Sequence, residues 1–150
     1  MTQNEVIQIV AGCVGTAGFG ILFHIRGMRL LVATLGGLLS WLLVAILNDW
    51  IVNEAINYFL VAFSIAIFAE IMARVLKTPT TAFITTSLVP LIPGASLYYT
   101  MEYVFESDMA GFLEKAVTTL QLASALALGT ILGRTLIKIL LQKSHGTYKA

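Results

Sequence analysis

The sequence predicts an all-α integral membrane protein with about five transmembrane helices, the fourth of which is broken at Pro90, Pro93 and Gly94. Of its 150 residues, 58% are hydrophobic and only 11% are charged, whereas roughly 25% of the residues of a soluble domain are charged. Five stretches contain no Asp, Glu, Lys or Arg, and with their flanks they approach or exceed the ~20 residues that span a bilayer. They are residues 6–23, 30–47, 55–69, 78–101 and 116–133.

The basic residues predict how these helices are oriented in the membrane. They follow the first, third and fifth apolar stretches, and the alternate connections contain only Lys115. The set comprises Arg26, Arg29, Arg74, Lys77, Arg134, Lys138, Lys143 and Lys149. Because basic connections remain in the cytoplasm, we expect the N-terminus outside, the C-terminus in the cytoplasm and an odd number of helices.

Residues 1–150 read as one transmembrane domain, because no linker or polar domain longer than a connection interrupts the apolar stretches. The first stretch lacks a basic region before it and is preceded only by Glu5, so we expect a retained helix rather than a signal peptide. The net charge is only +1, and nothing suggests binding to nucleic acid. The lipid bilayer is the expected surrounding.

The first and fifth stretches each carry small residues at four-residue spacing on one helix face. These are Gly12, Thr16 and Gly20 in the first stretch and Ala125, Gly129 and Gly133 in the fifth. Small residues at this spacing let two helix backbones approach closely within lipid. The two faces therefore either pack against helices of the same chain or dock onto a second membrane subunit.

Glu70 is the one acidic residue inside a predicted membrane helix, and Arg74 follows it by four positions. Residues at this spacing share a helix face, so an ion pair can lower the cost of placing the carboxylate in the membrane. The pair lies near the cytoplasmic end. It is either a proton site or cytoplasmic gate, or a structural clasp at the membrane edge.

The fourth stretch is interrupted by Pro90, Pro93 and Gly94. Proline removes a backbone donor and clashes with the preceding turn, and lipid cannot satisfy the carbonyls that this leaves unpaired. Such a break is tolerated where it is buried in protein or faces a watery cavity, which is where transporters place their binding sites. A proline-kinked helix packed against its neighbours is the alternative.

A new half-helix beginning at Gly94 would leave free amides near the middle of the bilayer. These amides and the aligned peptide dipoles favour an anion such as a carboxylate. Ser96 adds a hydroxyl in the first turn, and the amphipathic rings of Tyr98 and Tyr99 follow. We therefore predict a substrate site formed by Pro90, Pro93, Gly94, Ser96, Tyr98 and Tyr99.

No metal site, cofactor or catalytic centre is expected. His24 and His145 lie in the basic ends, Cys13 has no partner for a disulfide, and no cluster has the spacing of metal ligands. Neither histidine lies at membrane depth to serve a nucleophile, and no soluble catalytic module is present. The protein is therefore not expected to be an enzyme.

Residues 88–101, LVPLIPGASLYYTM, together with residues 69–79 before them, resemble the C-terminal half of the threonine/serine exporter family. Residues 20–23 and 35–41 are similar to that family too, so the resemblance covers nearly the whole chain. In this family the small half is either fused behind a larger half or is a separate protein beside it. A chain of 150 residues resembles the separate form.

The resemblance implies a hetero-oligomer with a larger membrane subunit in the bacterial plasma membrane. It implies export of small carboxylate-bearing metabolites, coupled to the proton gradient. The substrate would be threonine, serine or a dicarboxylate such as succinate, with which the split pair is associated. A non-transporting accessory subunit that stabilises a larger transporter is the alternative.

Overall fold

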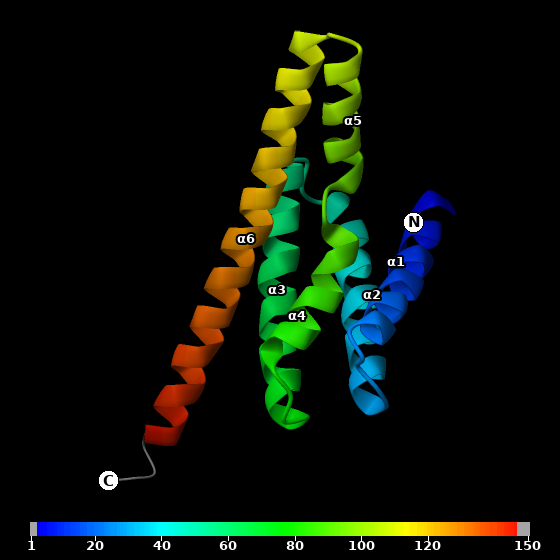
Figure 1. The fold of residues 1–150 in the computed structure, drawn as a ribbon. Helices are drawn as coiled ribbons and strands as arrows, with labels where there is room; N and C mark the ends of the chain where they lie inside the picture. Colours follow the sequence, from blue (N-terminus) through cyan, green and yellow to red (C-terminus); the bar gives the residue numbers. More distant parts are fainter. Residues whose placement is uncertain (1–2, 147–150) are drawn as a thin grey trace.

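Every regular element is helical within residues 3–146, the part of the chain whose placement the computed structural model describes. Side chains are described for residues 7–141, so Lys149 and the side chains of Glu5, Lys143 and His145 lie outside the described part. The elements, shown in Figure 1, are α1 (Gln3–Leu22), α2 (Met28–Asn48), α3 (Glu54–Val75), α4 (Thr80–Leu88), the 3₁₀ turn η1 (Val89–Leu91), α5 (Gly94–Phe105) and α6 (Met109–Gly146).

The all-α membrane fold with about five spans is confirmed. Among the described residues, three helical segments are long and apolar enough to cross a bilayer singly: α2, α3 and Met109–Leu141 of α6. A fourth span consists of Thr80–Leu91 and Gly94–Phe105, whose axes differ by 53°, so this span is broken at the predicted prolines. Ile7–Leu22 of α1 forms a shorter apolar helix.

The connections alternate between the two ends of the bundle (Figure 1). Arg26 lies between α1 and α2, Lys77 lies between α3 and α4, and Arg134 and Lys138 lie in the C-terminal part of α6. All three regions lie toward the same end of the molecule (Figure 1), as the predicted orientation requires. We call this the basic end, and the opposite end, where α2 joins α3, the outer end.

Helix α6 packs directly on the backbone of α3 through its glycines. A Cβ atom added to Gly133 would lie 2.6 Å from the carbonyl oxygen of Phe63, and one added to Gly129 would collide with the carbonyl oxygen of Phe59. Ala125, on the same face of α6, is buried. The small-residue face of α6 therefore contacts a helix of its own chain.

Helix α1 packs on α2 in the same way. Gly12 lies against the indole ring of Trp41, Thr16 lies against Gly37, and in each case an added Cβ on the glycine would collide with the facing side chain. Farther along, Gly20 lies against Leu30. The Thr16 hydroxyl donates to the carbonyl of Gly12 (2.7 Å), so this buried polar group is satisfied within α1.

The break in the fourth span is anchored in the core. Leu91 of η1 is buried with Val61 and Ile65 of α3, and Phe83 of α4 is buried in a second cluster formed with α2 and α3. Beyond the break, α5 packs against α6, and Figure 1 shows the two helices side by side, extending past the outer ends of α2 and α3. The first half of the broken span is therefore enclosed, and the second half is open.

The α3–α6 contact leads to a prediction about Gly133→Ala. The added methyl group meets a backbone oxygen that cannot move aside, so the free energy of unfolding should fall by about 1–3 kcal/mol. Gly18→Ala is the matched control, because an added Cβ there has no atom within 4 Å, and it should be neutral or slightly stabilising. Thermal unfolding followed by circular dichroism in detergent measures both. Equal midpoints for the two variants would contradict the close contact.

Candidate functional site

The break begins where α4 changes into a 3₁₀ turn. Pro90 lies in the first positions of η1 and has no N–H, so it cannot donate to the carbonyl four residues earlier. The amide of Ile92 instead donates to the carbonyl of Val89 (3.2 Å), which is the shorter bond of a 3₁₀ turn. The chain thus leaves α-helical geometry at Pro90.

Pro93 then redirects the chain. Its dihedral angles, φ −73° and ψ 61°, are those of an inverse γ-turn. The amide of Gly94 closes this turn by donating to the carbonyl of Ile92 (2.6 Å). An added Cβ at Gly94 would meet no atom within 4 Å, so the bend depends on the prolines more than on the small size of Gly94.

The N-terminus of α5 presents unpaired amides at this point. The amide of Leu97 donates to the carbonyl of Pro93 (3.0 Å), whereas those of Ala95 and Ser96 have no backbone acceptor in the described part of the chain. They lie halfway along the bent span, between its segments Thr80–Leu91 and Gly94–Phe105. Such amides, with the helix dipole behind them, can bind a carboxylate.

The predicted substrate residues do not all converge on the break. Pro90, Pro93 and Gly94 form it, and Ser96 lies half-buried in the next turn. The rings of Tyr98 and Tyr99 pack edge to face with centroids 5.6 Å apart, but they are 65% and 49% exposed. The two tyrosines therefore lie on the open surface of α5.

Two pockets flank the break, and Gln8 and Trp41, which line one of them, were not among the predicted site residues. One, of about 310 Å³, lies between the break and helices α1 and α2, and its lining includes Pro90, Gln8, Gly12 and Trp41. The other, of about 340 Å³, lies between Ile92 and α6. The polar side chain in its lining is Thr130, whose hydroxyl already donates a hydrogen bond to the carbonyl of Leu126 (2.7 Å). The first pocket is therefore better suited to a polar solute.

Helix α2 supports the end of α4 through a buried serine pair. Ser40 Oγ lies 2.9 Å from the carbonyl oxygen of Ser87 and 2.8 Å from that of Gly36, so its single hydrogen can bond to either. Gly36 permits this approach, because an added Cβ there would collide with the Ser87 hydroxyl. A hydroxyl from a neighbouring helix thus reaches the last turn before the break.

Glu70 forms the ion pair that its spacing predicts, but only one of its carboxylate oxygens is paired. Arg74 Nη2 donates to Glu70 Oε1 (3.3 Å), and the side chain of Glu70 is 5% exposed whereas that of Arg74 is 46% exposed. Glu70 Oε2 is buried and has no hydrogen-bond partner within the described residues.

Within the residues that the structure describes, no group of three or more His, Cys, Asp and Glu side chains could hold a metal ion. The chemistry that the geometry supports is binding of a solute at a bent membrane span.

Residues 8–136 match the family model described as Threonine/Serine exporter, ThrE. This range contains the broken span, Glu70 and both small-residue faces. No curated protein and no solved structure matches the chain.

The serine pair leads to a prediction about Ser40→Ala. Removing the hydroxyl removes its hydrogen bond to the carbonyl of Ser87 or Gly36, so the free energy of unfolding should fall by about 1 kcal/mol. Ser124→Ala is the control, because that exposed hydroxyl bonds only within its own helix, to the carbonyl of Gln121, and stability should not change. Thermal unfolding in detergent provides the comparison. A midpoint for Ser40→Ala equal to that of the unmodified protein would show that the pair contributes nothing.

Proposed function

The chain belongs to the threonine/serine exporter family, and from this membership we propose that it is the small subunit of a two-component secondary exporter. It moves small carboxylate-bearing metabolites, namely threonine, serine or a dicarboxylate such as succinate, across the bacterial plasma membrane. Its partner is a larger membrane subunit of the same family. The observation that carries the proposal is the 53° break, with the amides of Ala95 and Ser96 unpaired halfway along the span.

The substrate carboxylate binds at the N-terminus of α5. The two unpaired amides donate to it, the helix dipole favours its charge, and the Ser96 hydroxyl adds a third donor. Tyr98 and Tyr99 face outward from α5, so a substrate that touches them lies between this chain and the larger subunit. The site is therefore shared, and this chain forms one wall of it.

Glu70 and Arg74 act at the basic end as the cytoplasmic gate or the proton-coupling step. Protonation at the unpaired Oε2 would neutralise Glu70 and weaken its attraction to Arg74, which is exposed. Alternating access then takes place around the break, as in other transporters with discontinuous helices.

A non-transporting accessory subunit is the second candidate. It is favoured by the exposed apolar side chains of α5, including Leu97, Met101 and Phe105, which could cover a partner that is complete in itself. The two candidates differ in whether the larger subunit can export alone.

Efflux of labelled threonine, serine and succinate tests the proposal in cells that express this chain, the larger subunit, or both. We expect export only from the pair.

The pair carrying Pro93→Ala and Gly94→Ala should lose export at an equal membrane level, because straightening the span removes the free amides from mid-membrane. The exposed Thr81→Ala in α4 is the control and should export normally. Full export by the larger subunit alone would establish the accessory role, and full export by the double variant would overturn the site.

Glu70→Gln tests the proton step. The amide is similar in size but cannot take up a proton, so export by the pair should lose its dependence on an imposed proton gradient. Transport into or out of vesicles at several gradients measures this dependence, with Arg74→Gln for comparison. If Glu70→Gln keeps the full gradient dependence but lowers the unfolding temperature, the pair is a structural clasp.

A further inference from the structure

A third pocket lies at the outer end of the bundle, between α1, α2 and α3. Its volume is about 390 Å³, within the range of roughly 300–1,000 Å³ typical of small-molecule sites. Unlike the pockets beside the break, it is mainly polar. The polar and aromatic side chains that line it are Gln8, Trp41, Asn48, Glu54, Asn57 and Tyr58.

Asn57, which lines this pocket, has a side-chain oxygen that accepts no hydrogen bond from the described residues. The residue is only 1% exposed, and its Nδ2 donates to the carbonyl of Val44 (3.3 Å). Its Oδ1 is buried and has no hydrogen-bond partner in the described part of the chain. Because buried acceptors are nearly always paired in folded proteins, an unpaired one beside a pocket points to a ligand that donates a hydrogen bond.

The charge of the pocket indicates what that ligand carries. Glu54 is the only charged residue among the described residues that line it, and it precedes Asn57 by three positions, on the same side of α3. An ammonium group has three donors and a positive charge, which suit a carboxylate, an amide oxygen and the aromatic side chains of Trp41 and Tyr58. A ligand with only carboxylates would be repelled by Glu54.

The pocket adjoins the break. Gln8 and Trp41 line both this pocket and the pocket that contains Pro90. The outer pocket and the pocket beside Pro90 are therefore neighbours that share these two side chains. The amide groups of Gln8 and Asn48 can donate to a carboxylate at the same time as Glu54 holds an ammonium group.

We propose that this outer pocket binds the ammonium group of a small zwitterionic solute, with Glu54 and Asn57 Oδ1 as the acceptors. The inference rests on the proposed function, because the pocket is then where the exported solute is held before its release. It assigns a role in binding to Glu54 and Asn57, which lie outside the broken span.

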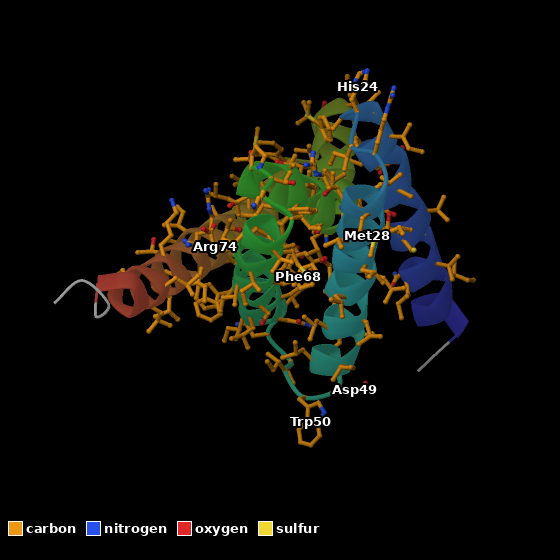
Figure 2. The ribbon with its side chains drawn as sticks, turned by 90° about the horizontal axis from the view of Figure 1, so that it is seen from below. His24, Met28, Asp49, Trp50, Phe68 and Arg74 are labelled. Atoms are coloured by element: carbon orange, nitrogen blue, oxygen red, sulfur yellow. The ribbon has the colours of Figure 1, made fainter. Side chains whose placement is uncertain are left out.

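Tryptophan fluorescence can report binding at this pocket, and a Glu54 variant separates that signal from binding at the pocket beside Pro90, which Trp41 also lines. The chain has two tryptophans, and Trp50 projects away from the helices at the α2–α3 connection, 85% exposed (Figure 2). The Trp50→Phe variant of the full chain, in lipid nanodiscs, therefore leaves Trp41 in the pocket as the sole reporter. We expect a saturable change with L-threonine and a weaker one with ethanolamine, which has the ammonium group alone, and none with succinate.

Glu54→Gln in the same background should weaken threonine binding at least tenfold. Asp49→Asn is the matched control, because Asp49 is an exposed acid at the end of α2 that is not part of the pocket lining, and it should bind as before. The proposal would be overturned if succinate and threonine gave equal responses, or if Glu54→Gln and Asp49→Asn bound threonine with equal affinity. The absence of any response would overturn it as well.

Efflux from cells separates this proposal from the proposed function. If the pair exports threonine but Trp41 does not respond, only the outer pocket is wrong. If no combination of subunits exports any solute, the exporter proposal fails, and a saturable response abolished by Glu54→Gln would still establish an ammonium site.

Discussion

The structure depends on one constraint: a membrane helix that is broken must have its backbone groups bonded by the protein, because lipid offers no partners. Two hydrogen bonds serve this need here, and one buried side chain anchors the break. The inverse γ-turn at Pro93 uses the amide of Gly94, the Ser40 hydroxyl reaches the last turn of α4, and Leu91 of η1 is buried among Val61 and Ile65. The amides of Ala95 and Ser96 are left over, and these are the groups that a ligand can use.

The glycines explain how so thin a bundle encloses the first half of the broken span. Gly36 lets Ser87 approach α2, Gly37 accommodates Thr16, and Gly129 and Gly133 bring α6 onto the backbone of α3. Without the hydrophobic effect to press helices together in lipid, such close contacts supply the packing energy. These contacts hold the helices that enclose α4, whereas α5 packs against α6 and keeps one face open.

The sequence was sufficient for the features that depend on local composition. Charge-free stretches predict the spans, prolines predict the break, and the four-residue spacing of Glu70 and Arg74 predicts their ion pair. The sequence could not predict the features that arise where distant segments of the chain pack together. Gln8 and Trp41 reach the pocket beside Pro90 only because α1, α2 and η1 pack together, and the burial of Asn57 depends on the packing of α3 against α2. No local pattern could indicate that Tyr98 and Tyr99 lie on the open side of α5.

The bend of the fourth span in a membrane is the most direct test of this account. Spin labels at Thr81 and Val104, after Cys13→Ser removes the one native cysteine, would be about 35 Å apart along a continuous straight helix. Double electron–electron resonance in nanodiscs measures the separation with and without the larger subunit. A broken span predicts one distribution, shorter than the straight-helix value, under both conditions. A distribution centred on that value would show that the span is straight, and the site at Gly94 and Ser96 would then not exist.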